Sequence, residues 1–228
     1  MNLTVLANST LYTPMPDVLT TLNEDSTLHL LQECYPKLNG IWLNGLTILN
    51  VRQVLSRYIR ERFRTSWVII NVGAVECYSH ASINFLQWCC HYLNFYGIDN
   101  LFSTFVIPKM LRVADSLCSG KEEFFQLLSA FEFGSILYST LRLLEGFSVI
   151  VIGMNEPKTE NEKWKEQARE YENEIISVCG QYNNVIRIDS WNMYSSYIVD
   201  TTHLTPEGHN NMFRFIQTII ENEGRKHE

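Results

Sequence analysis

Short apolar runs rich in β-branched residues recur along the chain and alternate with longer segments of helical periodicity. The runs 68–70 and 149–152 are apolar at every position, which is typical of strands buried on both faces of a parallel sheet. Parallel neighbours need long crossover connections, and the helical segments between the runs supply them. We therefore predict five strands, at residues 3–7, 41–43, 67–72, 147–152 and 185–188.

This alternation predicts an α/β fold, a flavodoxin-like three-layer sandwich with a five-stranded parallel sheet covered by helices on both faces. The length of 228 residues and the hydrophobic content of 46% suit one domain over residues 1–228. Thr205 is placed to cap the last predicted helix, and Pro206 to occupy its first turn. The predicted helices are at about 17–35, 50–64, 82–95, 161–181 and 206–222.

Two segments have a distinct composition. Residues 97–146 form the longest stretch between strand signals, and we interpret them as a helical insertion. The insertion is either a lid over a site or one more layer on the sheet, and its aromatic stripes favour the layer because such stripes usually lie in a core. Lys158 to Glu174 is rich in charges of alternating sign, which is typical of a solvated helix face.

Composition excludes several classes of function. The net charge of -7 disfavours binding to the phosphates of nucleic acid, and no apolar run is long enough to span a membrane. The chain begins without the features of a signal peptide, so we expect a cytoplasmic protein with reduced cysteines. Cys77 and His80 have a C-x-x-H spacing, but two ligands are too few for a zinc site, and we predict no metal. The oligomeric state stays open.

A candidate catalytic triad follows from the residues at the strand ends. In an open parallel sheet, ligands bind beyond the carboxyl ends of the strands, and Ser9 follows the first of them. A serine nucleophile needs a base, and the base needs an acceptor that orients it. Asp200 precedes His203 by three positions just before the last helix, so we predict the triad Ser9, Asp200 and His203. The backbone N–H groups of Ser9 and Gly45 are the predicted oxyanion donors.

Other residues that follow strands are candidates for substrate contact. Each also has an ordinary structural interpretation: a glycine may simply form a tight turn, a carboxylate is usually solvated, and a serine often caps a helix. The substrate-binding candidates are Asn44, Gly73, Glu76 and Asn155.

In the order of these elements the chain resembles the SGNH (GDSL-like) hydrolases, a superfamily of esterases and lipases. The strongest match is Asp200 to His209, which resembles the Asp-x-x-His element that precedes the family's last helix. Ser9, Gly45 and the segment Gly73 to Cys77 match the family's earlier blocks, and the last resembles a variant found in bacterial polysaccharide loci. Two features depart from the pattern. Val75 replaces the oxyanion asparagine, and the usual Gly-Asp before the serine is absent.

The resemblance implies a serine esterase that acts on a small acyl ester, such as an O-acetyl group of a carbohydrate, without a cofactor. An O-acyltransferase would use the same triad, and the sequence leaves both open. The two departures motivate a third alternative, a catalytically inactive SGNH-fold module that binds a carbohydrate or a protein, which the retained serine, aspartate and histidine oppose. Ser9 Oγ within hydrogen-bond reach of His203 distinguishes an enzyme from that module.

Overall fold

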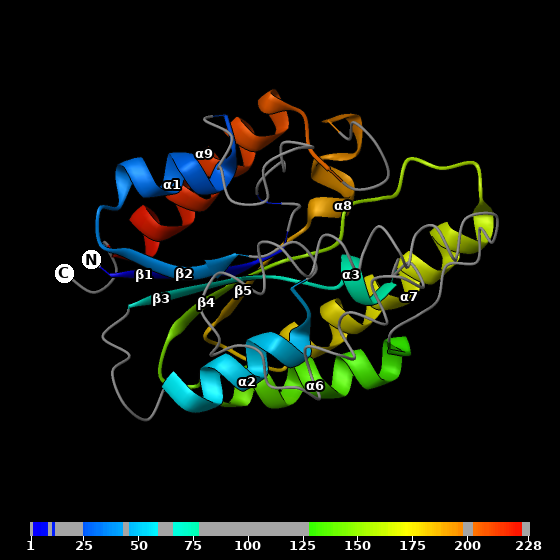
Figure 1. Cartoon of the computed structure of the whole chain (residues 1–228), viewed down its shortest axis with the longest axis horizontal. Helices are drawn as coiled ribbons and strands as arrows, with labels where there is room; N and C mark the ends of the chain where they lie inside the picture. Colours follow the sequence, from blue (N-terminus) through cyan, green and yellow to red (C-terminus); the bar gives the residue numbers. More distant parts are fainter. Residues whose placement is uncertain are drawn as a thin grey trace, which may run out of the picture.

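The described residues form one sheet of five parallel strands, as the sequence predicts, and the strand order is β2-β1-β3-β4-β5 (Figure 1). The computed structural model describes residues 2–8, 11, 25–42, 46–58, 66–77, 128–197 and 203–224. Side chains at 41, 42, 57, 58, 75 and 224 are outside that description. The strands are β1 (Leu3–Ala7), β2 (Leu38–Trp42), β3 (Trp67–Asn71), β4 (Ser148–Ile152) and β5 (Val185–Ile188).

Helices cover both faces of the sheet. The helices of the described residues are α1 (Thr27–Cys34), α2 (Ile48–Tyr58), α3 (Ala74–Cys77), α6 (Ala130–Arg142), α7 (Glu162–Cys179), α8 (Ser190–Met193), the short 3-10 helix η4 (Ser195–Tyr197) and α9 (Pro206–Gly224). In Figure 1, α1 and α9 lie on one side of the strands, and α2, α6 and α7 lie on the other. This arrangement is the predicted three-layer sandwich.

Two buried apolar clusters hold the layers together, because alternate residues of each strand face opposite sides of the sheet. In β3, Ile69 belongs to the cluster beneath α1 and α9, whereas Val68 and Ile70 belong to the cluster beneath α2, α6 and α7. All five residues of β1 and of β3 are buried. The predicted central strands lack hydrophobic alternation because helices bury both faces of the sheet, as expected.

The observed boundaries differ from the predicted ones where local caps or edges decide them. Strand β2 begins at Leu38 and not at residue 41. The prediction missed its start because Asn39-Gly40 is not apolar, as an edge strand that pairs with β1 alone does not require it to be. Helix α1 begins at Thr27, where the Ser26 side chain accepts a hydrogen bond from the His29 N–H at 3.2 Å. The predicted helix 82–95 and the first part of the helix 17–35 lie outside the described residues.

The predicted insertion at 97–146 is described from residue 128 onward, and this part contains α6. Ser129 and Glu132 form a reciprocal capping box at the start of α6. The helix packs against α2 and α7 and buries Phe133, Leu137 and Leu141 over the sheet. The described part is therefore a covering layer, and residues 97–127 lie outside the description.

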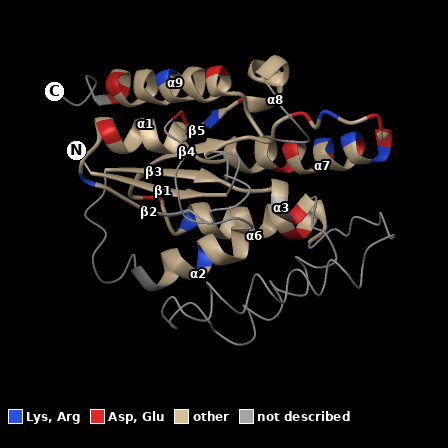
Figure 2. Cartoon of the chain, turned by 45° about the horizontal axis from the view of Figure 1, so that its top comes forward, with Lys and Arg blue, Asp and Glu red and all other residues tan. Residues whose placement is uncertain are grey.

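Helix α7 corrects one interpretation of the sequence. Its exposed positions carry the charges that the alternating pattern indicates (Figure 2). Glu172, however, is only 4% exposed, so the segment 158–174 is not a solvated face throughout. Glu172 belongs to the helical stripe that packs inward at three- and four-residue spacing. The other buried members of that stripe are Ala168, Tyr171, Ile175, Val178 and Cys179.

Candidate active site

The strand order reverses direction between β1 and β3, and this is the point at which open α/β sheets bind their ligands. Beyond the end of β1, the Asn8 N–H donates to the carbonyl oxygen of Asn71 at 3.2 Å, so the two strands stay paired up to their carboxyl ends. Ser9 is the next residue after Asn8 in the sequence and lies outside the described residues. Its assignment as nucleophile stays a prediction.

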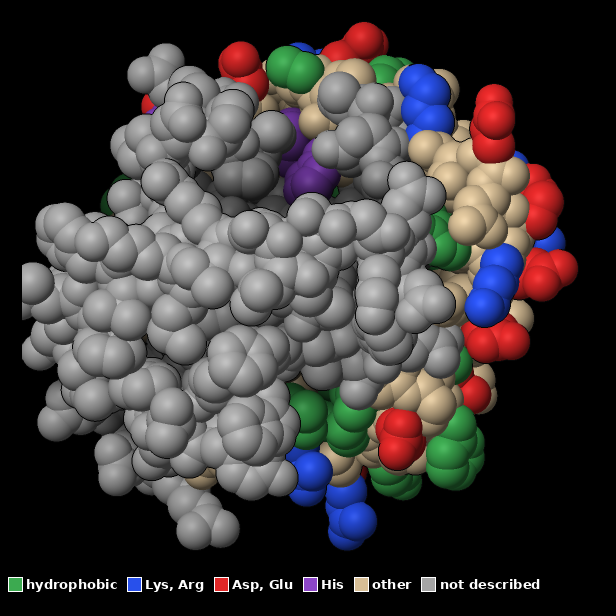
Figure 3. All heavy atoms as spheres, turned by 45° about the vertical axis from the view of Figure 1, so that its right-hand side comes forward, with side chains coloured by type: hydrophobic (Ala, Val, Ile, Leu, Met, Phe, Trp, Pro, Cys, Tyr) green, Lys and Arg blue, Asp and Glu red, His purple; other side chains and the backbone are tan. Residues whose placement is uncertain are grey.

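His203 is partly exposed and lies just before α9. As predicted, Thr205 caps this helix, since its Oγ1 accepts the Gly208 N–H at 3.1 Å. The Thr205 N–H donates to the Tyr197 carbonyl at 2.7 Å, which ties together the two ends of the segment 198–204. A Cβ on Gly208 would lie 2.7 Å from the Tyr197 Cβ, so only glycine permits this close approach of η4 to α9. Figure 3, turned toward the side on which the strands end, shows histidine atoms at the surface.

Glu76 has no exposed surface, and its carboxylate joins two segments of backbone. One oxygen accepts the Gly73 N–H at 3.0 Å, and the other accepts the N–H of Ile48, the first residue of α2. Burial raises the pKa of Glu76 to about 7, although the hydrogen bonds from these backbone amides oppose the rise. The carboxylate is therefore directed at backbone and not at the surface.

Gly73 forms the turn between β3 and α3 with a φ of +110°, a backbone conformation that other residues rarely adopt. A Cβ at this position would also lie 3.3 Å from the Met154 Sδ. The Gly73 N–H already donates to Glu76, so in this structure that N–H is engaged within the protein. The position requires glycine for the shape of the turn.

Asn155 is 7% exposed and follows β4. Its Oδ1 accepts a hydrogen bond from Ser190 Oγ, at the start of α8. This contact joins the segments that leave β4 and β5, and it places Asn155 on the same edge of the sheet as Gly73 and Glu76.

A partly buried ion pair supports the same edge. Glu172 of α7 accepts the Met154 N–H at 2.7 Å and pairs with Arg187 of β5 at 2.6 Å. Burial raises the pKa of Glu172 to about 7, while the Met154 N–H and the Arg187 charge act in the opposite direction. A Cβ at Gly153 would lie 2.7 Å from the Glu172 carboxylate, so glycine makes room for this pair.

His209 links α9 to α1. The Thr27 N–H donates to His209 Nδ1 at 3.3 Å, and Thr27 Oγ1 lies 3.0 Å from the same nitrogen. Because Nδ1 accepts from a backbone amide, the ring is neutral with its proton on Nε2. Burial, together with the nearby charge of His203, lowers the pKa of His209 to about 4.

The described residues thus bring Gly73 and Glu76 into direct contact and place Asn155 on the same sheet edge. Ser9, Asp200, Asn44 and Gly45 lie outside the description, so the triad and the oxyanion donors stay predictions. Sequence analysis missed the pair Glu172 and Arg187 and the contact of Thr27 with His209. Only the position of Glu172 within an apolar helical stripe signals its burial; the other contacts join residues far apart in the chain.

Within the described ranges, no group of three or more His, Cys, Asp or Glu side chains is arranged to hold a metal ion. Among the helices of these same ranges, none has both the length and the apolar character needed to cross a membrane.

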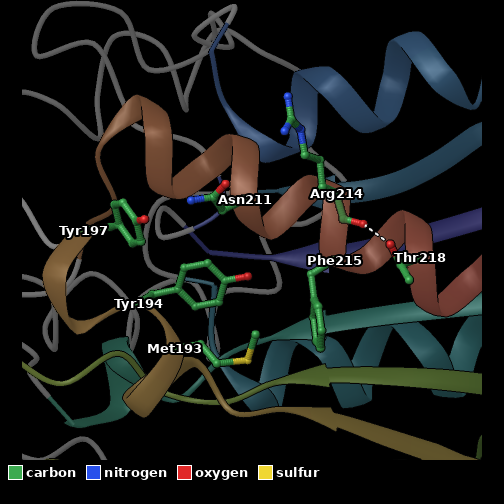
Figure 4. A pocket seen from close by; sticks show the side chains of 7 residues that line it. All are labelled: Met193, Tyr194, Tyr197, Asn211, Arg214, Phe215 and Thr218. Carbon is green, nitrogen blue, oxygen red and sulfur yellow. Dashed lines mark hydrogen bonds between the residues drawn. The ribbon is translucent and has the colours of Figure 1, made fainter.

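A pocket of about 360 Å³ lies between α9 and the segment of α8 and η4 that follows β5 (Figure 4). Tyr194 and Tyr197 contribute rings whose centres are 6.4 Å apart. In Figure 4, Phe215 and Arg214 leave α9 in opposite directions, so the guanidinium extends away from the apolar part of the pocket. The described lining residues are Met193, Tyr194, Tyr197, Asn211, Arg214, Phe215 and Thr218, and none of the predicted site residues is among them.

Comparison with solved structures gives matches over nearly the whole chain. A lipase/acylhydrolase from Enterococcus faecalis matches with a TM-score of 0.62 at 12% identity, covering 98% of this chain and 97% of that one. A G-D-S-L family lipolytic protein from Veillonella parvula matches with a TM-score of 0.58 at 9% identity, covering 93% and 94%. A carbohydrate acetylesterase from Sinorhizobium meliloti matches with a TM-score of 0.57 at 11% identity, covering 97% and 99%.

Comparison by sequence finds no matching family model and no matching curated protein. The identities to the solved structures are also low, so the likeness is one of fold. The chain has the fold of the SGNH (GDSL-like) hydrolases, as a divergent example of it.

Proposed function

We propose that the protein is a serine esterase of the SGNH type with Ser9, His203 and Asp200 as its triad. The observation that supports the proposal is the fold itself, because in the sequence Ser9 follows a strand of the switch point and His203 precedes the last helix. Ser9 directly follows the segment that pairs β1 with β3, and His203 directly precedes α9. The Thr205 N–H bond to the Tyr197 carbonyl joins the residues that flank the segment in which Asp200 and His203 stand in the sequence.

In the proposed reaction, His203 takes the hydroxyl proton of Ser9 while the serine oxygen bonds to the ester carbonyl carbon. Backbone N–H groups of Ser9 and Gly45 stabilise the oxyanion that forms. The tetrahedral intermediate collapses as the bond to the leaving oxygen breaks, and His203 returns its proton to the departing alcohol. Water, deprotonated by His203, then attacks the acyl-enzyme carbonyl. As the bond to the Ser9 oxygen breaks, His203 gives the proton back to that oxygen, and the carboxylic acid is released. Asp200 holds the imidazole in the tautomer that this cycle needs.

The proposed substrate is a small acyl ester, an O-acetyl group carried by a carbohydrate. The carbohydrate acetylesterase among the structures that share this fold supports this choice. Asn155 and Asn44 are proposed substrate contacts, since both follow strands that end at the same edge. The turnover of Ser9→Ala tests the function.

We expect the unmodified protein to hydrolyse 4-nitrophenyl acetate and acetylated oligosaccharides, and Ser9→Ala to lose about 10³-fold or more in kcat, since the nucleophile is gone. Ser135→Ala is the matched control. This serine lies on the exposed side of α6, where its hydroxyl donates to the Phe131 carbonyl, so its loss leaves kcat unchanged. Equal turnover by Ser9→Ala and the unmodified protein contradicts the proposed mechanism.

Two alternatives use the same fold. An O-acyltransferase would pass the acyl group from Ser9 to an alcohol, and the ratio of acid to new ester formed in the presence of a sugar acceptor distinguishes it from a hydrolase. A binding module without catalysis is favoured by one specific observation, the replacement of the expected oxyanion asparagine by Val75. Binding of acetylated sugar without any turnover supports that alternative.

A further inference from the structure

Glu76 is the most deeply buried acidic group among the described residues, and the proposed chemistry does not use it. The side chain has no exposed surface, yet a buried carboxylate is a costly way to fill space in a protein. Both of its oxygens accept backbone amides that belong to separate segments of the chain. Its position therefore calls for a role that an apolar side chain could not perform.

Glu76 joins the start of α2, which follows the predicted oxyanion donor Gly45 in the sequence, to the turn after β3. Ile48 opens α2, three residues after Gly45, the predicted oxyanion donor that follows β2. Gly73 opens the turn after β3, the strand that adjoins β1 at the switch point. The carboxylate spans the gap between these turns with one bond to each, so it fixes their relative position.

Helix α7 holds the same turn from its other side. The Gln167 side chain donates to the Cys77 carbonyl at 2.8 Å, and the Tyr171 hydroxyl, which also contacts the Leu128 carbonyl more closely, lies 3.3 Å from the Glu76 carbonyl. The short helix α3 is therefore held at its start by the Glu76 carboxylate and at its end by α7. Because α7 holds α3 in place, loss of the Glu76 bond to Ile48 would free the start of α2 to move relative to the turn at Gly73.

We infer that Glu76 is a positioning residue, which aligns the oxyanion donor after β2 with the nucleophile after β1 by tying Ile48 to Gly73. The inference rests on the proposed esterase function. Val75 makes this positioning important. A valine side chain supplies no hydrogen-bond donor, so the oxyanion depends on backbone N–H groups, and these act only when correctly placed. A misplacement of about 1 Å in such a site lowers the rate by roughly 10²-fold.

The substitution Glu76→Gln tests the inference. Glutamine has the same shape and keeps one acceptor oxygen, but its NH₂ group faces a backbone donor, so one of the two links is lost. We expect kcat for 4-nitrophenyl acetate to fall about 10- to 100-fold while KM changes less than about twofold, because only the transition state loses its alignment. Glu76→Asp, a shorter carboxylate, is expected to retain an intermediate kcat.

Asn184→Ala is the matched control. The Asn184 side chain likewise makes two bonds to backbone, but as a donor, to the carbonyls of Leu144 and Phe147 at 2.9 and 2.8 Å. These bonds lie at the opposite end of the sheet, where β4 and β5 begin. Its loss should lower the unfolding temperature without lowering kcat. A folded Glu76→Gln protein with the kcat of the unmodified protein overturns the inference and leaves the esterase standing. An unmodified protein that turns over no ester overturns the proposed function itself.

Discussion

Glu76 and His209 are buried ionisable residues whose pKa values move in opposite directions for the same physical reason. Burial disfavours the charged form, so it raises the pKa of the Glu76 carboxyl to about 7 and lowers that of the His209 imidazole to about 4. Each side chain is neutral over part of the pH range in which its unfolded counterpart is charged. The stability of the fold should therefore depend on pH in two separable ways.

For Glu76, the folded protein keeps a proton that the unfolded chain has lost between about pH 4.5 and 7. Stability contributed by this group therefore falls as pH rises through that window, by roughly 3 kcal/mol in all. Glu76→Gln cannot ionise and lacks this dependence. In urea titrations between pH 5 and 8, we expect the free energy of unfolding of the variant to increase relative to that of the unmodified protein as pH rises. Parallel pH profiles for the two proteins would show that Glu76 is not a buried titrating group.

At the scale of elements, α1 and α9 are packed together over one face of the sheet, and His209 with Thr27 provides the polar contact between them. Thr27 Oγ1 also donates to the His209 carbonyl at 3.0 Å, so this contact involves both the side chain and the backbone of α9. The neutral ring is required, since protonation at Nδ1 would set one N–H against another. The contact between these helices should therefore fail in acid.

The expected acid sensitivity follows from the depressed pKa of His209. Between about pH 6.5 and 4, His209 binds a proton in the unfolded chain but not in the folded protein. The free energy of unfolding therefore falls as pH decreases, and His209 accounts for roughly 3 kcal/mol of this fall. His209→Asn keeps an acceptor for the Thr27 N–H but cannot be protonated. We expect the stability advantage of the unmodified protein over His209→Asn to shrink as pH falls from 7 to 4. If this difference in stability does not change with pH, protonation of His209 does not control the contact, and the prediction is contradicted.

At the scale of the whole molecule, the sheet and its covering layers were predictable because the strands 67–71 and 148–152 are buried on both faces and therefore carry uninterrupted apolar runs. The edge strand β2 was misplaced at its start, since an edge needs less apolar sequence. Helix α3 has only four residues, which is too short to show a helical repeat in the sequence. Its bounds are set by Gly73 and by contacts with α7.

The sequence suggests the candidate triad through a short motif, and the triad stays a prediction because Ser9 and Asp200 lie outside the described residues. Asp200 and His203 stand three apart before a well-capped helix, a local pattern that the sequence displays directly. The environment of Glu76 depends on Ile48 and that of Glu172 on Arg187, residues brought close by the sheet and not by the chain. Burial of a charged residue is a property of such tertiary contacts, so sequence patterns favour the commoner solvated carboxylate.

The central claim is that Ser9 is an activated nucleophile served by His203. Intact-mass measurement after incubation with a fluorophosphonate tests it most directly, because the reagent bonds covalently to activated serines and needs no knowledge of the natural ester. We predict one adduct per chain, mapped to Ser9 by peptide mass, lost in Ser9→Ala and in His203→Ala and retained in Ser135→Ala. A folded protein that stays unlabelled, or one that is labelled equally well in Ser9→Ala, would contradict the account.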